Sequence, residues 1–425
     1  MPAPAGPFLS PLALSRDSLC YCANVHPGSD LAAVEANVAG PIAEVRRLRG
    51  LDRMACGLWL AAPVARTLAR APGRLKDLLE DNGLTLMTLN GFPYGDFHGE
   101  RVKEAVYAPG WDDPERLIYS LDLAQVLTHC MDPSRPEGTI SSLPLGLARD
   151  WTRARHRRAL DNLCAMAGAL AEVKAETGRH LRLCLEPEPG CTLESTDQAI
   201  ALFTLDLPEA ATRSGLDPAP IREHLGICLD VCHQAVLFED PAQSMTRLRQ
   251  AGIVVGKVQV SSALTVPTPD RVDLAALLAP FAEPRYLHQV RTRAAGGALT
   301  GWEDLPQALA AKDRPGASPW RIHYHIPIQH GDLGPGLGTT QAAIGAILDW
   351  LAREPGPQPH LEVETYTWDV LPPPRRPDGP HALAAGLAAE LTWLEGQMEL
   401  RGLLDRSPGG GSGPSSPGFA GGTDP

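Results

Sequence analysis

Residues 181–190 read LRLCLEPEPG and residues 225–234 read LGICLDVCHQ. Each stretch begins as an apolar run that ends at a carboxylate, and such runs predict strands covered on both faces, as in parallel sheets. Glu186 and Glu188 are two residues apart, so they point to the same side of an extended chain. A carboxylate at the end of a buried run has to be paired, protonated or bound to a cation. The alternative is a pair of solvated acids on a loop.

Similar runs recur along the chain and alternate with Ala- and Leu-rich helical stretches. The other strand candidates are LCYCANVHPG (19–28), MACGLWLAA (54–62), LTLMTLNGFPYG (84–95), TISSLPLG (139–146), VGKVQVSSAL (255–264), WRIHYHIPIQH (320–330) and HLEVETYTWDV (360–370). The helical candidates include residues 34–49, 65–82, 153–177, 241–250, 340–353 and 380–401. This alternation predicts parallel strands joined by helical crossovers. The predicted fold class is α/β, a (β/α)8 TIM barrel spanning residues 15–405.

There are nine strand candidates where a barrel needs eight. Residues 262–319 form a long stretch that contains a hairpin-like piece, YLHQVRTRAAGGALTGW (286–302), with Gly-Gly at its expected turn. We interpret this stretch as an insertion near strand seven. Either residues 255–264 or residues 320–330 can then supply strand seven. A doubly wound open sheet is the competing fold, but no G-x-G-x-x-G follows an early strand.

Further polar residues stand where other apolar runs end, which is where barrel enzymes place their active sites. Asp230 ends one run and His233 follows three residues later, a spacing that suits one metal or a metal and a substrate. The alternative is an Asp that only caps the next helix. His325 shares one strand face with His323, and Glu364 shares another with Glu362. Candidate substrate-binding residues are His26, Asn90, Tyr94, Gln259 and Trp368.

The composition excludes some kinds of partner. Acidic residues outnumber basic ones by 50 to 38, so the net charge is -12 and no basic face is expected for nucleic acid. No apolar stretch of about 18 residues and no signal peptide is present, so we expect a cytoplasmic protein without membrane insertion. The nine cysteines form no C-x-x-C pair and are expected to be buried. Residues 406–425, rich in Gly, Ser and Pro, are expected to be a disordered tail.

The order of these motifs resembles that of the xylose isomerase-like superfamily of TIM barrels, which includes sugar isomerases, epimerases and related endonucleases. More closely, several segments resemble the EboE family of metabolite traffic proteins over residues 19–394. The matching segments are YCANVHPG (21–28), LNGFPYGDFHG (89–99), VKEAVYAPGW (102–111), SSLPLG (141–146), LEPEPG (185–190), LDVCHQ (229–234), VQVSSAL (258–264), YLHQV (286–290) and LEVETYTWDVLP (361–372).

The superfamily resemblance implies a ligand set for one divalent metal, namely Glu186, Asp230, His325 and Glu364. Mn²⁺ is favoured, with Mg²⁺, Co²⁺ or Zn²⁺ as alternatives. The resemblance also implies that Glu186 and Glu364 serve as acid and base and that His233 faces the substrate. If Gln259 takes the strand-seven position instead of His325, the site is less charged and catalysis less expected.

Two functions follow from these implications. One is a metal-dependent isomerase or epimerase of a sugar-like substrate, in which two carboxylates remove and return a proton next to a carbonyl. The other is a non-catalytic carrier that binds a small metabolite and hands it on in an export pathway. The EboE resemblance implies this second role, together with partner proteins of a cluster that contains a prenyltransferase.

Overall fold

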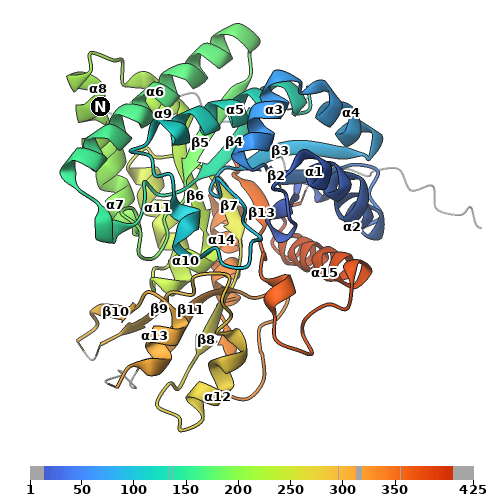
Figure 1. Ribbon diagram of the computed structural model, residues 1–425, viewed down its shortest axis with the longest axis vertical. Coiled ribbons are helices and arrows are strands. Elements are labelled where there is room, and N and C mark those ends of the chain that lie inside the picture. The colour runs from blue at the N-terminus through green and yellow to red at the C-terminus, as the bar shows by residue number, and fades with distance from the viewer. Residues whose placement is uncertain are drawn as a thin grey trace, which may run out of the picture.

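Eight parallel strands of the computed structural model close into a barrel (Figure 1). The structure describes residues 14–404 except 134, 136, 295, 313–317 and 355, so the expected tail at 406–425 lies outside the described residues. The barrel strands are β1 (Cys20–Cys22), β2 (Met54–Trp59), β3 (Leu84–Asn90), β4 (Glu137–Ser142), β5 (His180–Leu185), β6 (Leu225–Asp230), β7 (Val255–Val260) and β13 (His360–Val363). Their order is β1-β13-β7-β6-β5-β4-β3-β2, which confirms the predicted (β/α)8 barrel and excludes the open sheet.

Helices surround this barrel (Figure 1). Their ends follow local sequence signals: α6 begins after Thr152, whose side chain accepts from Arg155 N, and ends before Gly178, which has a φ of 71°. The outer helices are α1 (Leu31–Asn37), α2 (Ala43–Leu48), α3 (Ala62–Arg70), α4 (Gly73–Asp81), α5 (Pro114–Cys130), α6 (Arg153–Thr177), α7 (Thr196–Ala201), α8 (Leu207–Arg213), α9 (Ala219–His224), α10 (Val231–Val236), α11 (Pro241–Gln250), α14 (Ala342–Arg353) and α15 (Pro380–Glu399). No helix of the described part is long and apolar enough to cross a membrane.

A second sheet follows β7, drawn in yellow and orange in Figure 1. Its order is β10-β9-β11-β8-β12, and every pair in it is antiparallel. The strands are β8 (Ala263–Val266), β9 (Val290–Arg293), β10 (Leu299–Trp302), β11 (Trp320–His325) and β12 (Gly338–Thr339), with helices α12 (Leu274–Leu278) and α13 (Leu305–Ala310). The pairing of β9 with β10 confirms the hairpin predicted within 286–302.

The strand-seven ambiguity is resolved by the pairing. Strand β7 pairs in parallel with β6 on one side and with β13 on the other, so residues 255–260 are the seventh barrel strand. Strand β11, which carries His323 and His325, pairs instead with β8 and β9 of the second sheet. The two histidines therefore approach the barrel from outside it. The predicted insertion at 262–319 remains a prediction as a domain boundary, but strands of the second sheet extend to residue 339.

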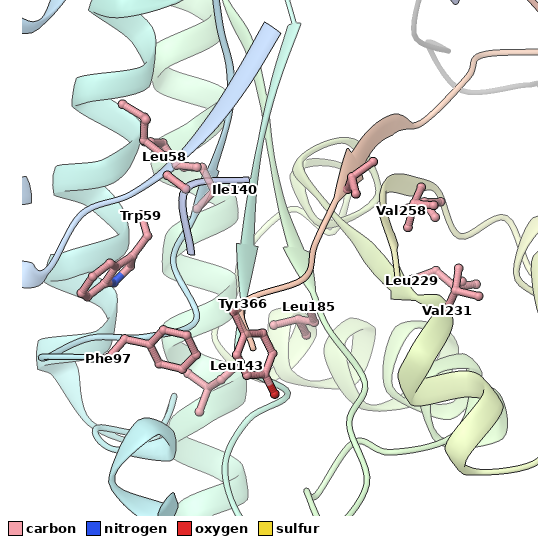
Figure 2. Close-up of a cluster of buried hydrophobic side chains, with 14 of the residues drawn as sticks. Leu58, Trp59, Phe97, Ile140, Leu143, Leu185, Leu229, Val231, Val258 and Tyr366 are labelled. Carbon is pink, nitrogen blue, oxygen red and sulfur yellow. The ribbon is translucent and has the colours of Figure 1, made fainter. Parts of the chain in front are cut away.

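Apolar side chains fill the space between strands and helices, and Figure 2 shows part of this core. Val258 is buried there, while its neighbours Lys257 and Gln259 form hydrogen bonds to Asn90 from across the barrel. Barrel interiors are usually filled by branched apolar residues, so polar side chains here mark an unusual interior. All nine cysteines are buried, as expected.

Candidate metal and acid–base site

The carboxyl ends of the barrel strands bring three acidic side chains together. Glu186 follows β5, Asp230 ends β6 and Glu364 follows β13. One carboxylate oxygen from each lies within 4.8 Å of the others, and all three residues are buried. A second group that satisfies the same distance is formed by Asp230, His233 and His325. The structure thus brings together the four residues predicted as metal ligands.

Local structure orients these ligands. Asp230 caps α10: its Oδ1 accepts hydrogen bonds from His233 N at 2.9 Å and from Ser261 Oγ at 2.8 Å. The predicted alternative of a capping Asp is therefore correct for Oδ1. The other oxygen, Oδ2, is buried and has no hydrogen-bond partner among the described residues. An unpaired buried carboxylate oxygen is costly, and here it faces the site.

His325 is oriented in the same way. Its Nδ1 donates to the backbone oxygen of Glu364 at 2.8 Å, which leaves Nε2 as the nitrogen with a lone pair. This Nε2 lies 3.9 Å from Asp230 Oδ2 and is without a hydrogen-bond partner in the described part of the chain. Glu364 Oε1 in turn accepts from Asn24 Nδ2 at 2.5 Å.

Burial and mutual repulsion perturb the acids of this site. Burial, with the Asp230 charge added, raises the pKa of Glu186 to about 8, even though His233 opposes the shift. Burial and then Glu186 and Asp230 raise the pKa of Glu364 well above its ordinary value. At neutral pH, without a cation, both carboxyls therefore retain protons. Burial lowers the pKa of His325 to about 4, so its ring is neutral and able to coordinate.

A second set of buried side chains, Glu188, His233 and His323, lies beside this group. Burial alone would lower the pKa of His233, but the charges of Asp230, Glu188 and Glu186 raise it above its ordinary value. His233 Nε2 lies 3.1 Å from His323 Nε2. Glu188 accepts from Tyr107 Oη at 2.6 Å and lies 3.4 Å from His323 Nδ1. Glu188 is thus already held by protein partners, unlike Glu186.

A cavity of about 60 Å³ lies over both sets of side chains. That volume holds a cation and a few waters. Its lining includes Phe97, Tyr286 and Tyr366, whose rings pack with centroids 4.9–5.4 Å apart. Figure 2 shows Phe97 and Tyr366 beside each other. Polar and aromatic side chains thus line the same cavity, which is the combination expected of a small-molecule site.

The donor set fits a divalent cation. Three carboxylates and one imidazole nitrogen supply the oxygen-rich shell typical of Mn²⁺ or Mg²⁺, and the imidazole also suits Co²⁺ and Zn²⁺. Asp230 Oδ2 and His325 Nε2 gain no hydrogen bond from the described residues but face one another. A cation would satisfy both atoms and remove the repulsion among the acids.

The predicted substrate-binding residues separate into two groups. Asn90 lines the cavity. Gln259 lies below it and donates to Asn90 Oδ1 at 3.0 Å, and His26 forms a short hydrogen bond with Tyr21. Tyr94 donates to Glu115 at 3.2 Å, and the Trp368 indole donates to Glu390 at 2.8 Å. These last four side chains are not among the residues that line the cavity in the described structure.

Other residues of the site were not among the predicted ones. Tyr107 and Gln289 hold Glu188, and both lie inside motifs already noted, VKEAVYAPGW and YLHQV. Lys257 donates to Asn90 Oδ1 at 2.7 Å and pairs with Glu362 at 2.6 Å, with both side chains 0% exposed. A lone lysine within the apolar run VGKVQV was the available signal for this pair.

No protein-family model and no curated protein matches the chain. Among solved structures, the probable 3-DHS dehydratase AsbF involved in petrobactin synthesis from Bacillus anthracis is 13% identical with a TM-score of 0.45, covering 89% of this chain and 98% of that one. A xylose isomerase domain protein from Planctomyces limnophilus is 14% identical with a TM-score of 0.46, covering 85% and 92%. The IOLI protein with a binding zinc atom is 12% identical with a TM-score of 0.42, covering 90% and 98%. At TM-scores below 0.5 these likenesses carry no argument about activity, and membership of the EboE family is not shown.

Proposed function

We propose that this protein is a metal-dependent isomerase or epimerase that moves a proton next to the carbonyl of a small sugar-like substrate. The observation that carries the proposal is the convergence of Glu186, Asp230 and Glu364, with mutual ligand-atom distances within 4.8 Å, beneath a cavity. Solvated loop acids would not converge in this way in a buried site.

Each residue has a role that its geometry supports. Burial raises the pKa of Glu186 to about 8 and that of Glu364 well above its ordinary value, so both carboxyls hold protons at neutral pH until a cation binds. A bound cation favours the carboxylate forms, and a carboxylate beside the substrate can take a proton from it and return it. Asn24 orients Glu364 through its 2.5 Å hydrogen bond. His233, whose pKa is raised by the acids around it, lines the cavity and holds His323 through the 3.1 Å contact between their Nε2 atoms.

When bound, a divalent cation supplies charge stabilisation for substrate oxygens next to the carbon that loses its proton. The aromatic rings of Phe97, Tyr286 and Tyr366 exclude water from the cavity, which strengthens every electrostatic interaction inside it. Polyhydroxy carbonyl compounds combine the oxygens that such a site would bind with an acidic carbon–hydrogen bond. Their oxygen donors and acidic carbon–hydrogen bond therefore match the chemistry of the site's donor set.

Solvent exchange tests the proposal without knowledge of the product. Protein reconstituted with Mn²⁺ is incubated in D2O with a panel of aldoses and ketoses, and loss of the carbon-bound proton is followed by ¹H NMR. We expect exchange with wild type and a loss of about 100-fold or more in Glu186→Gln and Glu364→Gln. Glu209→Gln, an exposed residue of α8, is the matched control.

The result distinguishes the enzyme from the carrier. If sugars bind to the metal-loaded protein but no proton exchanges, the carrier role in metabolite traffic replaces the proposal. Equal exchange in wild type and in both glutamine variants would exclude these carboxylates as the acid–base pair.

A further inference from the structure

A second cluster of histidine and carboxylate side chains lies at the opposite end of the barrel. His180 is the first residue of β5, and Glu223 and His224 end α9 directly before β6. Because β5 and β6 are parallel neighbours, these residues meet at the amino ends of the strands, away from the site described above. One ligand atom from each of the three lies within 4.8 Å of the others.

The His224 ring is held in an orientation that leaves one of its nitrogens without a hydrogen bond from the described residues. Its Nδ1 donates to the backbone oxygen of Leu181 at 2.8 Å, so Nε2 carries the lone pair. The side chain is 0% exposed, and Nε2 has no hydrogen-bond partner in the described structure. The nearest acid is Glu223, whose Oε2 lies 3.8 Å from this nitrogen. A fully buried, unpaired acceptor aimed at a carboxylate is not explained by packing.

The ring of His180 is also held by a backbone carbonyl group. Its Nε2 lies 3.2 Å from the backbone oxygen of Glu223, and its Nδ1 lies 3.9 Å from Glu137 Oε1. Metal-binding histidines characteristically give one N–H to a backbone carbonyl, which fixes the ring and exposes the other nitrogen. Burial lowers the pKa of His180 to about 4 and also lowers that of His224, so both rings are neutral at pH 7.

The charges around the cluster are balanced. Glu223 pairs with Lys174 through Oε1, which leaves Oε2 facing His224. Arg182 lies close enough to lower the pKa of His180, and Glu137 Oε1 lies 3.9 Å from Nδ1 of that ring. The side chain of Lys174 is 40% exposed, so it can turn outward when a cation approaches.

We propose that His180, Glu223 and His224 form a separate binding site for a transition-metal dication of the Zn²⁺ class at the amino end of the barrel. Two imidazole nitrogens with one carboxylate favour Zn²⁺, Co²⁺ or Ni²⁺ over Mg²⁺ and Ca²⁺, which prefer oxygen ligands. Zinc–nitrogen bonds are about 2 Å long, so the cluster closes around the ion by small side-chain rotations. The ion would tie α9 to β5 and stabilise this end of the barrel, independently of the proposed function.

The test separates the two ends of the barrel by mutation. The triple variant Asp230→Asn, His323→Gln, Glu364→Gln removes a ligand from each of the four candidate groups at the carboxyl ends of the strands, the upper site, and serves as the background. After chelator treatment of the full chain, Zn²⁺ is titrated by calorimetry and Co²⁺ by its visible spectrum. We expect the background to bind one Zn²⁺ per chain and to show a Co²⁺ spectrum of low coordination number. Adding Glu223→Gln and His224→Gln should weaken this binding at least tenfold, whereas Glu209→Gln should not.

Each outcome decides the proposal. A background variant that binds no Zn²⁺, or one that binds it equally well after Glu223→Gln, would overturn it. If His224→Gln fails to fold, Glu223→Gln alone gives the answer, because that side chain is 24% exposed and needs no repacking. If the upper site binds no metal, wild type and background bind the same single ion, so failure of the proposed function is distinguished from failure of this inference.

Discussion

Lys257 and Glu362 form a salt bridge inside the barrel with no exposure to solvent. Lys257 also donates to Asn90, which lines the cavity, so the pair forms the floor of the candidate site. Glu362 fits there because β2 offers Gly57, where an added Cβ would stand 1.7 Å from Glu362 Oε1. A buried ion pair costs desolvation energy, and removal of one partner leaves the other charge unpaired.

We therefore expect Lys257→Met to lower the free energy of unfolding by about 3–5 kcal/mol. The double variant Lys257→Met, Glu362→Leu should recover a large part of that loss, because no charge remains buried. Urea denaturation of the three proteins measures both effects. A loss of less than about 1 kcal/mol in Lys257→Met would show that Glu362 finds another partner or takes up a proton.

Glu186 and Glu188 differ in how they are held, although they lie two residues apart on the same segment. The Glu188 carboxylate is bound by Tyr107, whereas the described residues provide no hydrogen bond to that of Glu186.

In wild type treated with a chelator, Mn²⁺ at about a hundred times its Kd should stabilise the fold by about 2.7 kcal/mol. Glu186→Gln should lose most of this thermal response and Glu188→Gln much less. An equal response in all three would reject the ligand assignment, and no response in wild type would reject the metal site.

The strand-end acids were predictable from the sequence because each interrupts an apolar run at the point where the chain leaves the barrel. Glu186, Asp230 and Glu364 were identified in this way and do converge. The orientation of Trp368 was not predictable, since its place in the chain does not show that α15 offers Glu390 as a partner. The direction of a side chain outside a regular strand depends on what packs against it.

At the scale of elements, β7 and β11 looked equivalent in sequence. Both are short apolar runs that end in polar residues, and local pattern does not distinguish a parallel barrel strand from an antiparallel strand of an inserted sheet. The distinction comes from β8, which continues directly after β7 and pairs with β11. Partner choice between strands far apart in sequence is a tertiary property. For this reason the existence of these strands was predictable, but the sheet to which the strand of His325 belongs was not.

Helix α15 contributes a buried acid to the same region. Glu390 is 0% exposed and accepts hydrogen bonds from Ile328 N, Thr365 Oγ1 and Trp368 Nε1. Burial raises its pKa to about 7 despite these donors. Because the pKa of Glu390 is higher in the folded state than in the unfolded state, this residue stabilises the fold fully below about pH 4.5, and that contribution is lost as the pH rises through about 7. The difference between the two pKa values corresponds to a free energy of about 3 kcal/mol.

We therefore compare the free energy of unfolding of wild type with that of Glu390→Gln. The value for wild type minus the value for the variant should fall by up to about 3 kcal/mol between pH 4.5 and pH 7. Urea titrations followed by tryptophan fluorescence at several pH values measure it, with Trp368 as a nearby reporter. A difference that stays constant over this range would show that Glu390 remains ionised in the folded protein.

At the scale of the whole molecule, the candidate site joins the barrel to the second sheet. Several contacts already link them: Arg285 O accepts from Val102 N and Lys103 N at 2.9 Å, and the Lys103 ammonium lies 2.7 Å from Asp304. Tyr324 Oη donates to Val370 O at 2.7 Å. His325 adds one more potential link, because its Nε2 faces Asp230 of β6 without a hydrogen bond from the described residues.

A cation shared by His325, from β11, and Asp230, from β6, would hold the two sheets together. Opening of the second sheet would then require release of a ligand, so Mn²⁺ should slow amide hydrogen exchange in β9 and β11. At about a hundred times its Kd the slowing can reach about 100-fold for amides that exchange through this opening.

Strands β3 and β4, on the far side of the barrel from β7, should respond less. His325→Gln should abolish the effect, while His330→Gln, an exposed histidine just beyond β11, should retain it. Equal slowing of β4 and β11 would mean that the metal stabilises the molecule only globally, and an unchanged response in His325→Gln would place the link between the sheets elsewhere.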